Sequence, residues 1–339
     1  DVAAKIFPAP FVPLLVAAPA LGRYTIFGQH FARYGIGSNG AIYRLDRHPS
    51  ISKHPVTPMT EADLRTHLAK QTAKRIALFD ILKVALPAKE APIALSKLLA
   101  EKPDVVLFDA LSAEHLTMIG GLLEDFAKAK RPLFSVGSSG IEAALAAAWN
   151  KKRLAGTLAP PARQILVGSG SCSPVTSGQI AWALEHGFAE VSLDAMALAN
   201  TKTATTEIRR AAAAAAKFLQ DNRSVIVHST KSGSNNRVAA KLKGRTAEVL
   251  GAALGQVLRG AVEQSGVRRI CIAGGDTSSY AARALGIEAL EILAPLTPGA
   301  PLCRAHAPGS PIDGREVVFK GGQVGAENYF ATVRRGGAK

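Results

Sequence analysis

Short apolar runs rich in β-branched residues alternate along the chain with longer stretches in which apolar residues recur at helical spacing. This alternation predicts an α/β fold of two domains, each with a mainly parallel sheet flanked by helices, because βαβ units build such sheets. The expected strands are 11–17, 76–80, 105–109, 133–136, 165–167, 190–193, 225–228 and 269–273. The expected helices are 61–72, 113–128, 141–149, 177–186, 206–219, 247–265 and 278–285.

One stretch, at residues 151–163, interrupts this alternation with charge, glycine and proline. Such a composition is typical of a linker, so we expect one domain at 1–160 and a second at 161–339. A basic and polar stretch at 231–245 is expected to form a mobile surface loop.

The composition is that of a globular protein with a strongly basic balance. Of 339 residues, 47% are hydrophobic and 20% are charged, and the formal net charge is +15. A basic surface attracts nucleic acid, anionic membranes or small anions, although a merely solvated surface explains the charge as well. Aromatic residues make up only 6% and are not interleaved with runs of Lys and Arg, so we expect no nucleic-acid partner.

The cysteines and the apolar runs exclude further classes of protein. Cys172, Cys271 and Cys303 lie far apart, which predicts neither a zinc site nor a disulfide framework and fits the reducing cytoplasm. No apolar run reaches the length of a membrane span, so we expect no membrane partner. A homodimer is among the assemblies that the sequence allows.

The strongest chemical signal follows the expected strand 269–273. The chain turns there through Gly274, Gly275, Asp276 and Thr277 before the next expected helix. Glycines let the backbone approach a ligand closely, and the N–H groups at a helix N-terminus favour phosphate. An ordinary strand-to-helix turn, with Asp276 or Thr277 as the N-cap, accounts for the same residues equally well.

Two further apolar runs in the second half lead into loops of small residues. Ser171 and Ser173 lie in one loop, where hydroxyl and backbone groups could donate to phosphate oxygens or bond a ribose. Gly321 and Gly322 follow Lys320 in the other. None of these loops matches the P-loop or the dinucleotide fingerprint. Because parallel strands bring such loops to one edge of a sheet, the three together predict a ligand site.

The first half contains a Pro-rich loop that is dense in basic side chains. Arg44, Arg47 and His48 lie in it, and such side chains could hold the carboxylate or phosphate of a substrate. A structured, solvated loop explains the histidine as well, and its spacing from His54 does not suit a metal site. Asp109 ends another expected strand, where carboxylates often face a ligand. No residue is assigned as the catalytic base.

Taken in order, several segments resemble the four-carbon acid sugar kinase family. The resemblance covers essentially the whole chain, and the ordered combination is far more specific than any single motif. The matching segments are Arg-Leu-Asp-Arg-His-Pro from Arg44, His-Pro-Val-Thr-Pro-Met from His54, Gly-Ser-Gly-Ser-Cys-Ser-Pro-Val-Thr from Gly168, Gly-Gly-Asp-Thr from Gly274, Pro-Gly-Ala-Pro from Pro298, and Lys-Gly-Gly-Gln-Val-Gly from Lys320.

The resemblance implies a kinase that phosphorylates tetronates or 3-oxo-tetronates with ATP and a divalent metal, normally Mg²⁺. Carried over by motif, Ser173 or Ser171, the turn from Gly274 to Thr277, and Gly322 would lie at the ATP site. The Arg-His-Pro loop also resembles that of members acting on branched oxo-sugar acids such as 3-oxo-isoapionate. The Ala-Asp-Asp-Leu-Thr-Gly-Ala-type motif that opens the family is not in this sequence, so much of the sugar-acid site would be missing and catalysis could be lost.

Two other functions compete with this interpretation. A non-catalytic protein could bind a nucleotide or another anion with the same loops. An NAD(P)-dependent oxidoreductase would require the dinucleotide fingerprint, which the chain lacks.

Overall fold

The computed structural model describes residues 1–36, 39–54, 57–127, 132–149, 159–171, 173–229, 242 and 244–337. The chain divides into two compact units. Unit 1 comprises Asp1–Tyr34 and Asn39–Leu154, and unit 2 comprises Gly35–Ser38 and Ala155–Lys339. Most of the linker expected at 151–163 and of the loop expected at 231–245 lies outside the described residues, as does Cys172.

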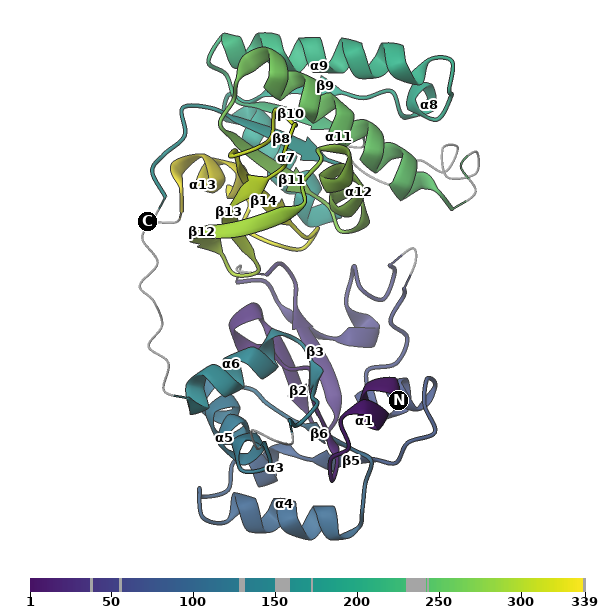
Figure 1. Cartoon of the computed structure of the whole chain (residues 1–339), viewed down its shortest axis with the longest axis vertical. Coiled ribbons are helices and arrows are strands. Elements are labelled where there is room, and N and C mark those ends of the chain that lie inside the picture. Colours follow the sequence, from purple (N-terminus) through teal and green to yellow (C-terminus); the bar gives the residue numbers. More distant parts are fainter. Residues whose placement is uncertain are drawn as a thin grey trace. The chain divides into compact units, whose positions relative to one another are not determined.

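Unit 1 is built on a parallel sheet of four short strands (Figure 1), whose order is β5 (Ile76–Phe79), β6 (Val105–Phe108), β1 (Val12–Leu15) and β7 (Val136–Gly137). Apolar residues of the strands face both sides of this sheet, as parallel sheets require. One side is covered by α3 (Ile81–Val84), α4 (Ala91–Ala100), α5 (Ala113–Glu124) and α6 (Ser139–Ala148), and the other by α2 (Leu64–Ala69). The short α1 (Val2–Ile6) buries no residue.

Unit 1 also contains a three-stranded antiparallel sheet that the hydrophobic pattern did not predict. It consists of β2 (Arg23–Ile26), β3 (Gln29–Arg33) and β4 (Ile42–Arg44), with the 3₁₀ turns η1 (Pro19–Leu21) and η2 (Leu45–Arg47) beside it. Phe27 and Gly28 join β2 to β3 with φ values of 50° and 78°. Such two-residue turns usually begin with Asn, Asp or Gly, so Phe27 gave no turn signal in the sequence.

Unit 2 is built on a seven-stranded sheet whose order is β12 (Ala289–Thr297), β13 (Ala300–His306), β14 (Glu316–Lys320), β11 (Arg269–Ala273), β8 (Ile165–Ser169), β10 (Val225–His228) and β9 (Ala189–Ser192). The last five strands are parallel, whereas β12 and β13 form an antiparallel hairpin at one edge. The predicted α/β class with mainly parallel sheets is therefore confirmed. The strand expected at 133–136 is wrong in extent, because pairing is limited to the two residues of β7.

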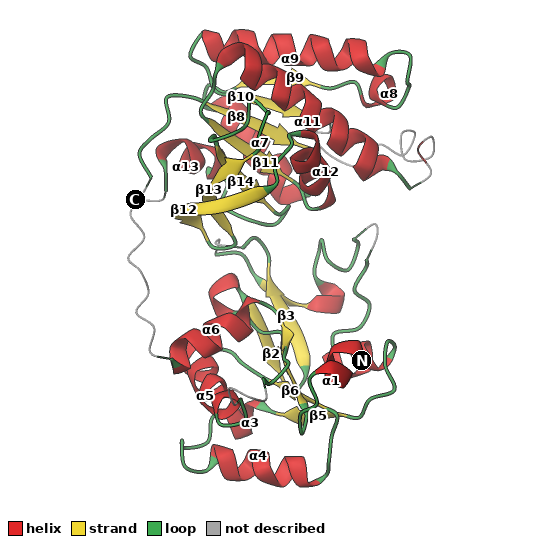
Figure 2. Cartoon of the chain, viewed as in Figure 1, coloured by secondary structure: helices red, strands yellow, loops and turns green. Residues whose placement is uncertain are grey.

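Helices cover both faces of the sheet in unit 2 (Figure 2). One face is covered by α9 (Ala204–Gln220), α11 (Thr246–Ser265) and α12 (Asp276–Ala284), with α8 (Ala195–Leu198) beside α9, and the other by α7 (Pro174–Glu185) and α13 (Tyr329–Arg335). This double cover explains why the central strands are continuously apolar in the sequence. Within the described ranges, no helix combines the length and the hydropathy that a membrane span requires.

Arg269, at the start of β11, is a buried cation with 1% of its surface exposed. Its Nε donates to the carboxylate of Glu316 at 2.7 Å, its Nη1 to the carbonyl of Val333 at 2.7 Å, and its Nη2 to the carbonyl of Pro160 at 2.8 Å. Burial of a charge is tolerated when the charge is paired and hydrogen-bonded in this way. One side chain thus ties β11 to β14, to the end of α13 and to the segment that leads into β8.

We expect Arg269→Met to lower the free energy of unfolding of unit 2 by roughly 3 kcal/mol, because it removes the buried partner of Glu316, which keeps only its bond from Arg268, and the side-chain donor of the Pro160 carbonyl. Urea unfolding followed by the fluorescence of Trp182 measures this, in a Trp149→Phe background that removes the other tryptophan. Glu291→Gln is the control, since its pair with Arg304 is about half exposed and should contribute less than about 1 kcal/mol. Equal losses in the two variants would contradict the assignment.

Candidate functional site

Three neighbouring parallel strands of unit 2 end at the same edge of the sheet. Their last residues, Ser169 of β8, Ala273 of β11 and Lys320 of β14, are paired in one row. The loops that follow these strands therefore begin side by side. These are the three loops of small residues that the sequence singled out.

Hydrogen bonds join the loops to one another. The N–H of Gly170 donates to the carbonyl of Ala273 at 3.2 Å, and the N–H of Gly274 donates to the carbonyl of Lys320 at 3.0 Å. The hydroxyl of Thr277 donates to the carbonyl of Gly170 at 3.4 Å, and its side chain is buried. The side chain of Thr277 therefore holds two loops together, and only its backbone N–H is left to meet a ligand.

The turn between β11 and α12 leaves backbone N–H groups without backbone acceptors, and two of its residues, Gly275 and Asp276, are exposed. Gly274 has a φ of 143°, a conformation that residues with a Cβ rarely adopt. Gly275 is the N-cap of α12 rather than Asp276 or Thr277, and a Cβ built on it would meet nothing within 4 Å. The N–H groups of Gly275, Asp276 and Thr277 find no backbone acceptor in the described part of the chain. With the helix dipole, they form a place that favours an anion.

Gly322 packs closely against the loop that follows β8 and contains Ser171 and Ser173, here called the serine loop. A Cβ on Gly322 would lie 3.0 Å from Ser171 Oγ and 3.0 Å from Ser173 Cβ, so a larger residue would separate the two loops. The buried Ser171 Oγ accepts the N–H of Ser173 at 3.2 Å, whereas the partly exposed Ser173 Oγ accepts Gln323 Nε2 at 3.0 Å. Ser173 is therefore better placed than Ser171 to meet a ligand. Gly321 is exposed beside them.

Two buried polar residues of α7 hold the loop that follows β14. Thr176 was expected from the sequence to offer its hydroxyl to a ligand, and Gln179 was not singled out. Thr176 Oγ1 donates to the carbonyl of Gly322 at 3.0 Å, and Gln179 Nε2 donates to the carbonyls of residues 324–326 at 2.9 to 3.0 Å. Ile36, which belongs to unit 2, pairs with Val324 of this loop in an isolated parallel β-bridge. The available signal was a Thr and a Gln three positions apart, which places them on one side of a helix.

The basic residues predicted for substrate binding have different surroundings within unit 1. Arg44 forms a two-bond ion pair with Asp46, both bonds at 2.7 Å, and this pair holds the pKa of the carboxyl below its ordinary value. Arg47 is exposed. His48 is fully buried, its Nδ1 accepts the N–H groups of Ser50 and Ile51 at 3.2 Å, and burial lowers its pKa. The role of these three residues in binding stays a prediction.

Asp109, expected to face a ligand, contacts backbone instead. Its Oδ1 accepts the N–H of Gly28 at 3.0 Å and its Oδ2 accepts the N–H of Ile81 at 3.1 Å. The side chain is buried, and this burial raises its pKa. These contacts tie the turn of the antiparallel sheet and the start of α3 to the parallel sheet, which is a structural role.

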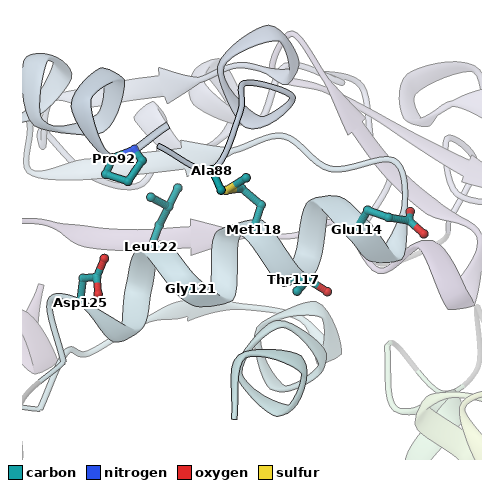
Figure 3. A pocket seen from close by; sticks show the side chains of 8 residues that line it. All are labelled: Ala88, Pro92, Glu114, Thr117, Met118, Gly121, Leu122 and Asp125. Carbon is teal, nitrogen blue, oxygen red and sulfur yellow. The ribbon is translucent and has the colours of Figure 1, made fainter. Parts of the chain in front are cut away.

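A groove of about 570 Å³ lies between α5 and the N-terminal part of α4 in unit 1. Figure 3 shows Met118 and Leu122 of α5 directed toward Ala88 and Pro92. Its charged lining residues, Glu114 and Asp125, are both acidic. The groove is thus unsuited to an anionic ligand, in contrast to the three loops of small residues in unit 2, here called the glycine loops. Among the described residues, no group of three or more His, Cys, Asp or Glu side chains could hold a metal ion.

Comparison with known proteins places these features in a family context. Residues 1–145 match a family model described as a sugar-binding N-terminal domain, and residues 166–330 match one described as a nucleotide-binding C-terminal domain. A 3-oxo-isoapionate kinase of Paraburkholderia graminis is 40% identical over 353 aligned positions, which cover 99% of this chain and 73% of that protein. A 3-oxo-tetronate kinase of Pseudomonas savastanoi is 29% identical over 83% of this chain and 63% of its own length.

Solved structures share the fold along the whole chain. A protein from Salmonella typhimurium LT2 superposes with a TM-score of 0.73 at 23% identity, covering 99% of this chain and 75% of its own. A Haemophilus influenzae protein superposes with a TM-score of 0.64 at 21% identity, covering 98% of this chain and 76% of its own. At such identities the likeness concerns the fold.

We expect Gly170→Ala to destabilise unit 2 by roughly 1–3 kcal/mol, because its Cβ would lie 2.3 Å from Thr277 Cγ2 in a closely packed place. Gly178→Ala in α7 is the matched control, since a Cβ there meets nothing within 4 Å and should stabilise the helix by roughly 0.5–1 kcal/mol. Urea unfolding of both variants measures the difference. A Gly170→Ala protein as stable as wild type would show that the two loops are not in contact.

Proposed function

Because the chain belongs to the four-carbon acid sugar kinase family, we propose that it transfers the terminal phosphoryl group of ATP to a hydroxyl of a small sugar acid. The hydroxyl oxygen of the acid forms the new bond to phosphorus and its proton is released to solvent, while the bond between phosphorus and the bridging oxygen breaks and ADP leaves. Such a transfer depends on positioned phosphates and on donors aimed at the developing charge.

The convergence of three glycine loops at one edge of the sheet in unit 2 carries this proposal. The N–H groups of Gly275, Asp276 and Thr277 would bond the phosphates, because they lie at a helix N-terminus without a backbone acceptor, and Gly275 and Asp276 are exposed. Gly274 gives the turn its shape, and the remaining two loops would approach the nucleotide from either side. The residues of those loops are Ser171, Ser173, Gly321 and Gly322, with Ser173 preferred over Ser171.

Asp276 is the residue that we assign to the Mg²⁺ ion of the reaction. Its exposed carboxylate begins α12 beside the proposed phosphate site and does not act as the helix cap. Protein sites often bind Mg²⁺ through one or two carboxylates together with substrate phosphates, so a single carboxylate suits this mode. The ion would neutralise charge on the phosphates during transfer.

The second substrate would bind in unit 1. We expect a tetronate, a 3-oxo-tetronate or a branched oxo-acid such as 3-oxo-isoapionate, with Arg44, Arg47 and His48 among the residues that recognise it. Activity in the cytoplasm is proposed on the basis of Cys271 and Cys303, which are both buried free thiols. A homodimer stays part of the proposal.

A non-catalytic nucleotide-binding protein is the second candidate. The chain spans 73% of the length of one named relative and 63% of another, so a relative's complete substrate site can include residues beyond this sequence. Incubation with ATP, Mg²⁺ and a panel of four- and five-carbon sugar acids separates the two functions. Release of ADP with one acid supports the kinase, whereas ADP binding without turnover on any acid supports the second candidate.

We expect Gly275→Asp to weaken ADP binding at least about a hundredfold. A carboxylate about 5 Å from a phosphate repels it by about 3 kcal/mol at an effective dielectric constant of about 20. Isothermal titration calorimetry measures the affinity, and Gly275→Ala is the control, because a Cβ fits the open space there. Affinity for ADP that is unchanged by the aspartate would place the nucleotide elsewhere.

A further inference from the structure

Lys320, the last residue of β14, is a buried cation with 1% of its surface exposed. Its Nζ donates to Thr176 Oγ1 at 2.8 Å and lies 5.6 Å from the centre of the Tyr329 ring. The side chain of Lys320 therefore reaches from the end of β14 to the first turn of α7 and to α13. The Gly321–Gly322 turn follows it directly in the chain.

No carboxylate balances this charge among the residues that the structure describes. The titratable groups that face Lys320 are Cys271 of β11 and Tyr329 of α13. Burial raises the pKa of the Cys271 thiol to about 12 and that of the Tyr329 hydroxyl well above its ordinary value, so both are neutral at physiological pH. Burial also lowers the pKa of Lys320 to about 8.

The place is unfavourable for a cation for a second reason. Thr176 belongs to the first turn of α7, and the N-terminus of a helix carries a partial positive charge. An unpaired buried ammonium at such a position costs folding free energy, in contrast to Arg269, whose charge is paired with Glu316. An anion bound nearby would remove this cost.

Lys320 is connected to the loops of the proposed nucleotide site in two ways. Its carbonyl accepts the N–H of Gly274 at 3.0 Å. Its ammonium reaches the carbonyl of Gly322 through the hydroxyl of Thr176, which donates to that carbonyl at 3.0 Å. The charge is therefore buried next to the loops and is linked to them by hydrogen bonds.

We propose that Lys320 is a positioning residue that holds the Gly322 turn through Thr176. It also supplies a buried positive charge for the phosphates of a nucleoside di- or triphosphate, a role that rests on the proposed nucleotide site. It acts from beneath the turn and does not touch the phosphates. Folding leaves this charge unbalanced, and the bound phosphates balance it.

We expect Lys320→Met to weaken ADP binding at least about tenfold at pH 7.5, because the counter-charge of the phosphates is lost. The melting temperature without ligand should stay equal to that of wild type or rise, because an apolar chain of similar size replaces an unpaired buried charge. Lys217→Met, at an exposed position of α9, removes the same net charge and should leave ADP affinity unchanged. Calorimetry and thermal unfolding measure the two effects.

The wild-type chain provides a test that needs no variant. Binding of phosphates should raise the pKa of Lys320, so ADP binding should take up protons. Because the pKa of the free protein is about 8, the affinity should fall roughly three- to fivefold as the pH rises from 8 to 9. The second pKa of a phosphate group is about 6, so ADP itself does not titrate in this range. Calorimetry in buffers of different ionisation enthalpy detects the proton uptake, which Lys320→Met should abolish.

The outcomes separate this proposal from the proposed function. Wild-type ADP affinity in Lys320→Met, or no proton uptake by the wild-type chain, would overturn the role of Lys320 while the nucleotide site stands. A melting temperature of Lys320→Met below that of wild type would show that the folded protein already compensates the ammonium charge, and it would also overturn the role of Lys320 as an unbalanced charge. Failure of the wild-type chain to bind ADP would overturn the nucleotide site and this role together.

Discussion

Hydrogen bonding between β8, β11 and β14 aligns Ser169, Ala273 and Lys320 in one row, and the proposed nucleotide site depends on that alignment. The register determines which loops become neighbours, and small residues determine how closely they approach. Gly322 contacts Ser171 and Ser173 in a space that a Cβ would fill, and Thr277 bonds Gly170 of the same loop. Phosphate recognition here would come from backbone geometry, which the sheet fixes before any ligand arrives.

The sequence was informative where one local rule sufficed. Continuous apolar strands that lead into glycines predicted both the parallel sheet of unit 2 and the three loops at its edge. The hairpin of β12 and β13 and the sheet of β2 to β4 escaped prediction, because their pairing depends on tertiary contacts and Phe27 stands where a turn residue is expected. The bonds of Lys320 and Gln179 appeared only in the structure, since a polar residue in an apolar stretch does not reveal what it bonds.

Two buried charged residues at strand ends show how similar positions acquire different roles. Asp109 follows β6 in unit 1 and accepts two backbone N–H groups, so its hydrogen-bonding capacity is used within the unit. Lys320 ends β14 in unit 2, and its ammonium contacts the hydroxyl of Thr176 and the ring of Tyr329 but no carboxylate among the described residues. Position at the carboxyl edge of a parallel sheet therefore does not define a ligand-facing residue; what distinguishes the two is whether the protein itself satisfies the charge.

The contacts of Arg269 also bear on how unit 2 is assembled in time. Its bonds to Pro160 and Val333 close loops that span 109 and 64 positions of the chain. Contacts of such sequence separation form late and slow folding, because the entropy of loop closure must be overcome first. During synthesis the guanidinium group cannot be buried with all its partners until α13 has been made. The sheet that carries the three loops of small residues therefore reaches its final stability only after α13 has been translated.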